Sequence, residues 1–411
     1  MLSTVSSYPR WLAQMRSTPA SPFLDSFVAA LSKAGYHTTT IQEFVRDGAH
    51  LSLWLKYRGQ TLIKHGAIEI ERFKRHFASC SCPHVRRSSR RLGRGAELLL
   101  RHLEDIGVIA RPVPPAPQQP ALLADFCRWM QQHRGTKAQT LKIYGRVISE
   151  ALRALGDDPS QYDARHLRAF VLERAPRFGR SKAKQVVTAL RAFVRYLIAQ
   201  GRCPVGLDAA IPTIAGWKLG SLPQYMRAAD VERVLASCDP TTAIGARDRA
   251  ALLLLCRLGL RAGDVAHLHW RDIDWQQATV EVVGKSQRAA RLPLPQEVGD
   301  ALLLHLTNAP SAAPSDWVFL NSAPPLGRAL GSSGVSCIVR RAILRANVQA
   351  PARGAHVLRH SAATSLLADG ASLQSIGVLL RHRLLDTTTT YAKVDFKALS
   401  TLARPWPEVS P

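Results

Sequence analysis

Along most of the chain, hydrophobic residues recur at intervals of three and four, which is the period of an amphipathic helix. The segment 182–197 is the clearest case. Its apolar positions are Val186, Val187, Leu190, Phe193, Val194 and Leu197, and its interleaved basic positions are Lys182, Lys184, Arg191 and Arg195. We therefore expect a helix with one packed face and one positively charged face.

Proline and glycine interrupt this helical pattern twice. The segment 113–120 is rich in proline and cannot continue a helix, and between 206 and 222 glycine and proline recur without a period. These breaks predict a helical domain over 1–112, a linker over 113–120, a second helical domain over 121–205, a linker over 206–222 and a third domain over 223–411.

The apolar pattern of the first domain resembles that of the second. Leu24 corresponds to Leu123, and Leu99 corresponds to Phe193, at a nearly constant offset. One interpretation is the duplication of a small helical module. The other is that two amphipathic bundles share such a pattern by chance, and the sequence leaves both open.

The third domain mixes helical and strand patterns. Residues 247–258 form an apolar run that predicts a buried helix, and Gly259 can end it in a left-handed cap. Residues 279–283 alternate as a strand, and 291–294 return after a turn, which predicts a β-hairpin. The expected fold is mainly α with a small β-hairpin or sheet, in which helical modules precede a mixed α+β domain.

The charge of the chain requires an anionic partner. Its 55 Lys and Arg against 30 Asp and Glu leave a net charge of +25, which favours nucleic acid, because basic side chains that neutralise phosphates release counterions. An anionic membrane surface is the alternative, although the apolar run 250–256 is far shorter than the roughly 20 residues that span a bilayer. Five arginines between 86 and 94 are either a DNA contact or a solvated loop.

The cysteines and the N-terminal sequence indicate the compartment. Seven cysteines, an odd number, are scattered along the chain, which suits a reducing environment. The first residues lack a basic patch followed by an apolar stretch. We therefore expect a cytoplasmic protein without a membrane anchor.

One short cluster contains the residue types that bind zinc. It is Cys80-Ser81-Cys82-Pro83-His84, and no second pair of ligands follows at a zinc-like spacing. The expectation is free thiols in a loop, with no metal site and no cofactor.

Two motifs of the third domain carry residues that suit phosphate chemistry. Breaking a phosphodiester without metal requires fixed cations, a nucleophile in line and an acid for the leaving oxygen, and arginine grips phosphate through two parallel hydrogen bonds. The segment 258–264 reads LGLRAGD, in which Asp264 can orient the guanidinium of Arg261. The segment 356–360 reads HVLRH, in which His356 and Arg359 share a helix face.

A third motif lies further along and contains a candidate nucleophile. The segment 380–391 reads LRHRLLDTTTTY, where Asp386 can cap a short helix that presents Tyr391. Each of these groups is more often structural when it stands alone. Their order within one segment, 261–391, makes a catalytic interpretation the stronger one.

This ordered set resembles the catalytic domain of the tyrosine recombinase, or phage integrase, family. LGLRAGD is similar to the family's first arginine box, and HVLRH with the steps to His382 and Tyr391 is similar to its second box. The helical part over 121–205 fits the family's core-binding domain by position and pattern. DNA contacts are therefore expected from Lys182, Lys184, Arg191 and Arg195.

The resemblance implies a role for each matching residue. Arg261 and Arg359 would clamp the scissile phosphate, and His382 would hydrogen-bond to it. His356 would be an acid/base partner near the nucleophile, Lys285 in the hairpin turn would protonate the leaving 5′ oxygen, and Asp264 would support the site structurally. Tyr391 would form a covalent 3′-phosphotyrosine.

The resemblance also implies the activity and the partners. The chain would be a site-specific recombinase or integrase of a mobile element, acting on double-stranded DNA as a tetramer without metal or ATP, with other recombinases of the same element as further partners. Residues after Tyr391 resemble tails that dock on a neighbouring subunit. One departure is Arg381, where the family usually has glycine: a bulky side chain there could disturb the turn or add a phosphate contact.

Two other functions share some of these features. A type IB topoisomerase has the tyrosine and the clamp, but the helical core-binding part and the spacing of the motifs favour a recombinase. A DNA-binding protein that has lost catalysis is disfavoured by the intact set of Arg261, Lys285, His356, Arg359, His382 and Tyr391.

Overall fold

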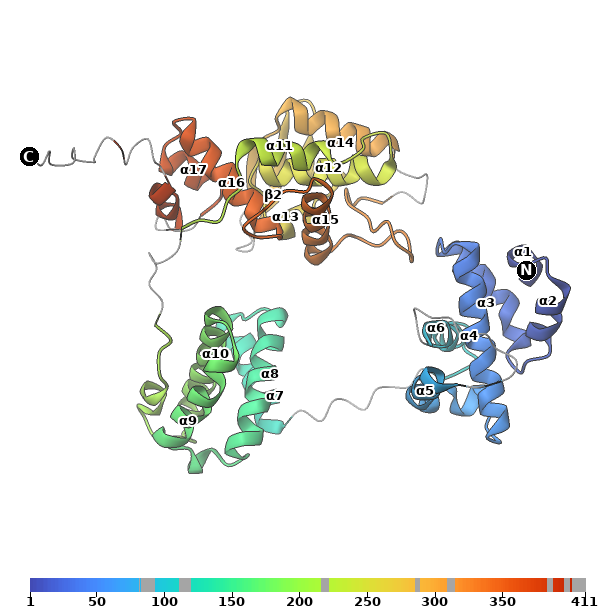
Figure 1. Cartoon of the computed structure of the whole chain (residues 1–411). Coiled ribbons are helices and arrows are strands. Elements are labelled where there is room, and N and C mark those ends of the chain that lie inside the picture. The colour runs from blue at the N-terminus through green and yellow to red at the C-terminus, as the bar shows by residue number, and fades with distance from the viewer. Residues whose placement is uncertain are drawn as a thin grey trace, which may run out of the picture. The chain divides into compact units, whose positions relative to one another are not determined.

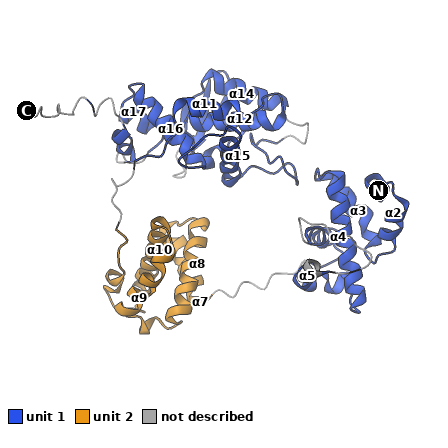
Figure 2. Ribbon diagram, in the orientation of Figure 1, with its two compact units in different colours: residues 1–110, 222–411 blue, residues 111–221 orange. Residues whose placement is uncertain are grey.

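The computed structural model describes residues 1–80, 82, 93–110, 120–215, 222–284, 289–308, 315–382, 387–394 and 400, without the side chains of 77–79. The described part is mainly helical, with a three-stranded sheet (Figure 1). Two compact units are distinguished, one of Met1–Ala110 with Leu222–Pro411 and one of Arg111–Ser221 (Figure 2). The expected fold class, mainly α with a small sheet, is confirmed. The Pro-rich linker 113–120 lies, except for Pro120, outside the described residues.

The N-terminal part is a bundle of helices around its own apolar core. Its elements are α1 (Leu2–Val5), α2 (Pro9–Arg16), α3 (Ser21–Lys33), α4 (Thr38–Tyr57), α5 (Leu62–Ser79) and α6 (Arg94–Asp105). Helices α4 and α6 pack closely because they meet at glycines. A Cβ atom on Gly95 would come within 2.4 Å of the backbone of Phe44, and one on Gly48 within 2.7 Å of the side chain of Leu99.

The second unit is helical, as the sequence predicts, and its described residues form four main helices. They are α7 (Ala121–Arg134), α8 (Ala138–Leu155), α9 (Ala164–Arg174) and α10 (Arg180–Ala199), followed by a short 3₁₀ helix, Leu207–Ala210. The apolar face of α10 is buried as expected, with Phe193 packed edge-on against Phe126 at a centroid distance of 5.3 Å. Leu24 and Phe27 of the first part and Leu123 and Phe126 of the second are all buried. The duplication of a module stays a prediction.

The C-terminal part surrounds helix α12, in which residues 250–256 are all buried. Its elements are α11 (Ala228–Ala236), α12 (Ala243–Cys256), α13 (Ala262–Ala266), β1 (Ile273–Asp274), β2 (Thr279–Val283), β3 (Ala289–Pro293), α14 (Gln296–Asn308), α15 (Ser332–Arg345), α16 (Ala355–Ala368), α17 (Leu373–Leu379) and a 3₁₀ helix, Thr389–Val394. The strands are antiparallel in the order β1-β2-β3, with Val280 opposite Leu292. The predicted hairpin is therefore confirmed.

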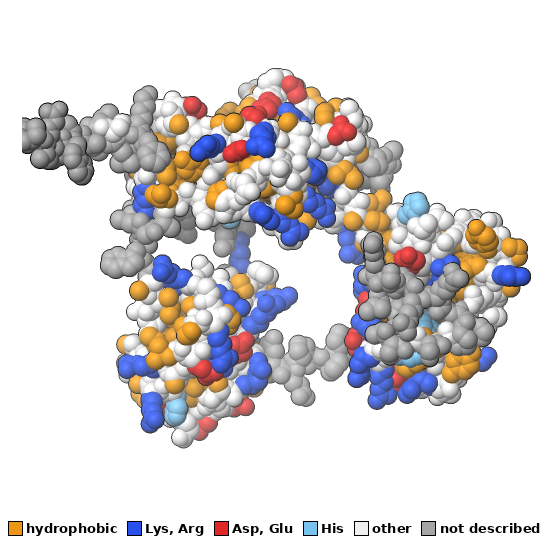
Figure 3. Space-filling model, viewed as in Figure 1, with side chains coloured by type: hydrophobic (Ala, Val, Ile, Leu, Met, Phe, Trp, Pro, Cys, Tyr) orange, Lys and Arg blue, Asp and Glu red, His pale blue; other side chains and the backbone are white. Residues whose placement is uncertain are grey.

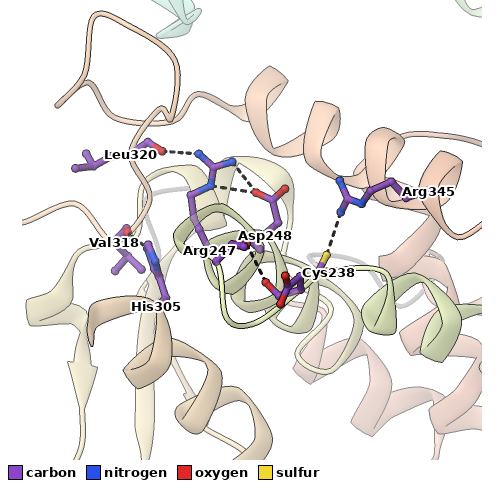
Figure 4. A network of polar contacts seen from close by, with 10 residues as sticks. Cys238, Arg247, Asp248, His305, Val318, Leu320 and Arg345 are labelled. Atoms are coloured by element: carbon purple, nitrogen blue, oxygen red, sulfur yellow. Dashed lines mark hydrogen bonds and ion pairs between the residues drawn. The ribbon is translucent and has the colours of Figure 1, made fainter. Parts of the chain in front are cut away.

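Helix α12 begins four residues earlier than the sequence predicts, and its first turns carry a buried ion pair. Arg247 donates to Asp248 at 2.6 Å and to the carbonyl of Leu320 at 3.1 Å (Figure 4). His305 of α14 bonds the carbonyl of Val318 at 2.8 Å. These contacts tie the segment 317–320 to α12 and α14. Within the described residues, no helix is both long and apolar enough to cross a membrane.

Candidate active site

Arg359 lies at the centre of the candidate site. It projects from α16, is only 4% exposed, and donates to the carbonyl oxygens of Gly259 and Leu380. Gly259 adopts a left-handed conformation (φ 58°) just after α12, as the sequence predicts, and a Cβ atom there would come within 2.5 Å of Leu380. Glycine therefore allows the end of α12, α16 and the end of α17 to meet at one guanidinium.

Burial and positive neighbours act on Arg359 together. Loss of solvation, followed by the nearby charge of Arg261, lowers the pKa of Arg359 to about 10. The group therefore stays protonated at neutral pH. Two guanidinium groups close to each other in a buried setting favour binding of an anion with delocalised charge, such as a phosphate.

Asp264 does not orient the side chain of Arg261 in the way that the sequence suggests. Its carboxylate accepts the backbone N–H of Arg261 at 2.9 Å, which caps the start of α13, and it forms a buried ion pair with the guanidinium of Arg381. The partners of Asp264 are therefore a backbone amide and a different arginine, and its supporting role stays a prediction. The reason is that α13 begins at residue 262, so that Asp264 falls in the first turn of this helix.

Arg381 occupies a backbone position that suits glycine. Its φ of 54° is left-handed, and its N–H bonds the carbonyl of Val378 at 2.9 Å, which closes the end of α17. The turn is therefore kept, with a strain on the order of 1 kcal/mol for a residue that carries a Cβ. The side chain is 10% exposed, and its Nε and Nη1 atoms are buried without a hydrogen-bond partner among the described residues. These two donors are available to an anion.

His382 lies beside this cluster. Its Nδ1 is 2.7 Å from the hydroxyl oxygen of Thr388, and burial together with the charges of Arg359 and Arg261 lowers its pKa to about 4. The imidazole is therefore neutral at pH 7. When the hydroxyl donates to Nδ1, Nε2 carries the proton and can donate one hydrogen bond to an anion.

Tyr391 is buried in the 3₁₀ helix that follows, with 2% of its surface exposed. Its phenol oxygen lies 2.9 Å from Nδ1 of His360, and its ring is parallel to that of His382 at a centroid distance of 6.5 Å. Burial raises the pKa of the phenol, whereas Arg359 and Arg261 oppose this rise. Desolvation, with His356 and Arg359, lowers the pKa of His360, which leaves a neutral imidazole able to accept a proton.

The histidine in contact with Tyr391 is thus His360 and not His356. His356 is exposed one turn earlier on α16, and its ring centroid lies 6.4 Å from that of His360. The sequence contains His360 inside the HVLRH motif, but spacing alone does not indicate which of two histidines on one helix face points at a residue more than 30 positions away.

Some expected site residues lie outside the described part of the chain. Lys285 and Asp386 are among them, as are the arginines 86–91 and the tail 401–411. In the sequence, Lys285 falls between Val283, the last residue of β2, and Ala289, the first residue of β3. Its proposed role stays a prediction.

The four basic residues of α10 differ in their surroundings. Lys182 and Lys184 are exposed near the start of the helix. Arg191 donates to the carbonyl of Ile211 at 2.8 Å, and Arg195 pairs with Asp208 at 2.7 Å. The two lysines are therefore the better candidates for contacts outside the unit, and all four stay predictions.

Comparison with known proteins finds similarity to integrases and recombinases. The model of the phage integrase family matches residues 224–398. The chain is 36% identical over 399 residues to the putative integrase/recombinase y4rA of Sinorhizobium fredii, with 95% of each chain covered. It is 29% identical over 290 residues to the tyrosine recombinase XerD of Listeria innocua, covering 66% of this chain and 94% of that relative.

Solved structures share the fold at lower identity. The XerH site-specific recombinase bound to palindromic difH substrate matches with a TM-score of 0.58 at 19% identity, covering 84% of this chain and 97% of that one. The Tn1549 transposon integrase in complex with transposon right end DNA matches with a TM-score of 0.55 at 15% identity, covering 68% of this chain and 99% of that one.

Proposed function

Because this chain belongs to the phage integrase family of tyrosine recombinases, which carry out site-specific recombination by cutting and rejoining DNA strands, we propose that Tyr391 is its nucleophile and that cleavage proceeds through a covalent 3′-phosphotyrosine. The observation that carries this proposal is the hydrogen bond of 2.9 Å between Tyr391 and the neutral His360, beside the buried Arg359 and the charge of Arg261.

The proposed chemical step uses these side chains together with Lys285. The phenol oxygen of Tyr391 attacks the phosphorus while its proton passes to His360, and the bond from phosphorus to the 5′ oxygen breaks. Lys285 protonates the leaving 5′ oxygen. Arg261 and Arg359 neutralise the charge that builds on the non-bridging oxygens, and His382 donates a further hydrogen bond.

Rejoining reverses the same step. The 5′ hydroxyl of a second strand attacks the phosphotyrosine, so the energy of the phosphodiester bond is retained and no ATP is required. The cations in this scheme are side chains, and the chemistry therefore requires no metal. His356 is exposed beside His360 and is proposed as a secondary acid/base group that exchanges protons with solvent.

The substrate of this proposal is double-stranded DNA. A net charge of +25 supports it, and groups of Lys and Arg side chains lie on the surface of both compact units (Figure 3). Lys182 and Lys184 of α10 would contact backbone phosphates, with Arg191 and Arg195 beside them. Since phosphate contacts add salt-dependent affinity without sequence information, these residues position the chain on its site.

We further propose that the protein works as a tetramer for a mobile element, in integration or transposition, in the cytoplasm and together with other recombinases of that element. A likeness to the lambda integrase tetramer bound to a Holliday junction supports this assembly, with a TM-score of 0.54 at 18% identity. The relative y4rA, a putative integrase/recombinase, supports the role in DNA integration.

A nicked suicide substrate tests the mechanism. The short fragment with a 5′ hydroxyl diffuses away after cleavage, so religation fails and a protein–DNA adduct accumulates that resists boiling in detergent. The adduct should map by peptide mass to Tyr391 and be absent in Tyr391→Phe. Lys285→Ala should slow its formation, and a 5′ bridging sulfur, whose leaving group needs no proton, should restore much of the rate. An adduct on another residue would refute the proposal.

A further inference from the structure

Four potential metal ligands converge in the N-terminal bundle, far along the sequence from Tyr391. They are His50 of α4, His76 of α5, Cys80 at the end of α5, and Cys82. Their ligand atoms all lie within 4.8 Å of one another. The sequence interpretation of Cys80 and Cys82 as free thiols depended on the lack of a second ligand pair, and the packing of α4 on α5 supplies that pair.

The sulfur–nitrogen distances in this cluster fit tetrahedral coordination of one metal ion. Cys80 Sγ lies 3.5 Å from Nε2 of His50, and Cys82 Sγ lies 3.5 Å from Nε2 of His76. Zinc binds thiolate sulfur at about 2.3 Å and imidazole nitrogen at about 2.0 Å, so a tetrahedral ion holds sulfur and nitrogen roughly 3.5 Å apart. Both sulfur–nitrogen pairs match this value.

We propose that His50, His76, Cys80 and Cys82 bind one structural zinc ion in the N-terminal part of the chain. Two thiolates and two imidazoles are soft or intermediate ligands that favour zinc over magnesium and calcium, which prefer oxygen. Four protein ligands complete a tetrahedron and leave no open position for substrate, which is typical of a structural and not a catalytic site.

The surroundings hold the ligands in place. His50 is 3% exposed and Cys80 is 7% exposed. The ring of His76 stacks on Trp54 at a centroid distance of 5.6 Å, and the ring of His50 packs edge-on against Phe73 at 5.1 Å. Aromatic walls of this kind fix the imidazole orientation and exclude water, as the outer shell of a zinc site requires.

One backbone contact orders the cysteine pair. The backbone N–H of Cys82 donates to Cys80 Sγ at 3.2 Å, which holds the two residues close together.

Such an ion would add coordination bonds between α4 and the end of α5. Cys80 and Cys82 follow the last turn of α5, whereas His50 lies in the middle of α4. Zinc would therefore fix the end of α5 against α4, and chelation should lower the thermal stability of the bundle. This role is independent of the recombination chemistry proposed for Tyr391.

Metal analysis of the full chain provides the test. The protein, purified without chelator, should contain one zinc ion per chain by mass spectrometry of the metal. After removal of zinc, added Co²⁺ should produce the visible absorption of a tetrahedral ion and a thiolate-to-cobalt charge-transfer band. A chain that binds neither ion with these signatures would overturn the proposal.

Variants connect the metal to these side chains. Cys82→Ser is preferred because Cys82 is partly exposed, and it should abolish the charge-transfer spectrum or weaken it with a loss of at least tenfold in Co²⁺ affinity. Cys127→Ser is the matched control, since Cys127 is also a partly buried thiol but lies in the second unit. If Cys82→Ser fails to fold, His76→Gln serves instead. Full zinc content and an unchanged cobalt spectrum in Cys82→Ser, or in His76→Gln where it replaces that variant, would overturn the assignment.

Discussion

The Nδ1 atom of His360 and the phenol oxygen of Tyr391 lie 2.9 Å apart, within a site from which most solvent is excluded. This contact gives the phenol proton a direct route to an acceptor. Since burial lowers the pKa of His360 below its ordinary value of 6.5, the imidazole stays unprotonated and ready to accept that proton at neutral pH.

His360→Ala should therefore slow formation of the covalent adduct by about 100-fold or more, the usual contribution of a positioned base. His356→Ala, the matched control on the same face of α16, should have a smaller effect because its ring is exposed. Single-turnover cleavage of a suicide substrate measures both. In the parent protein the rate should fall only as the pH drops below about 6.5, because protonation of the base begins below the ordinary histidine pKa. A larger loss in His356→Ala would contradict this assignment.

Alanine variants of Arg261 and Arg359 should both lose DNA cleavage but should differ in the stability of the fold. Arg261→Ala should leave DNA binding within a few fold and reduce cleavage by several orders of magnitude, because it acts where charge develops. Arg359→Ala should do the same and also destabilise the fold by about 2 kcal/mol or more, since the carbonyls of Gly259 and Leu380 lose a buried donor.

Gel shift, suicide-substrate cleavage and urea unfolding, measured side by side, separate these effects. Arg359→Lys, which keeps the charge, is the control for stability. Equal loss of binding and cleavage in Arg261→Ala would show that this residue serves affinity and not the transition state.

Arg381→Gly should retain the fold but cleave DNA more slowly. Glycine relieves the left-handed strain at φ 54°, a gain on the order of 1 kcal/mol, whereas the ion pair with Asp264 is lost. Two buried guanidinium donors also disappear. We expect a decrease in cleavage of about tenfold with binding nearly unchanged, which a cleavage assay at saturating DNA measures. If Arg381→Gly cleaves DNA faster than the parent protein, Arg381 does not contribute to cleavage.

Asp264→Asn tests the other partner of the ion pair between Asp264 and Arg381. It leaves Arg381 buried without its counter-charge, and removal of one partner from a buried pair typically costs about 3 kcal/mol or more. The double variant Asp264→Asn with Arg381→Gly should recover part of this stability, as a double-mutant cycle in urea would show. Strict additivity of the two changes would contradict a direct interaction.

Cleavage should survive excess EDTA, because the cations of the mechanism are side chains. The assay is a brief incubation with chelator followed by single-turnover cleavage, with Mg²⁺ or Zn²⁺ added back separately. Activity that disappears and returns with Mg²⁺ would indicate a metal-dependent nuclease. A loss of cleavage that Zn²⁺ alone restores would instead indicate that the chelator removed zinc from the cluster of His50, His76, Cys80 and Cys82.

The local pattern of the sequence determined the helices and strands. It also determined the order of the catalytic motifs along the chain. The apolar period over 182–197 is sufficient to predict the buried face of α10, and alternation over 279–283 is sufficient to predict β2. Both follow from the geometry of a single helix or strand, which depends only on neighbouring residues. The motifs around Arg261, Arg359 and Tyr391 likewise identify the family from short spacings.

Contacts between distant residues were decided by the tertiary structure alone. The choice of His360 over His356 as partner of Tyr391 depends on how α16 packs against the 3₁₀ helix Thr389–Val394. The pairing of Asp264 with Arg381 depends on how α13 meets the end of α17. His50 likewise meets Cys80 only because α4 lies against α5. No local period encodes these distances, because a side chain that crosses between two elements is placed by the core packing of both.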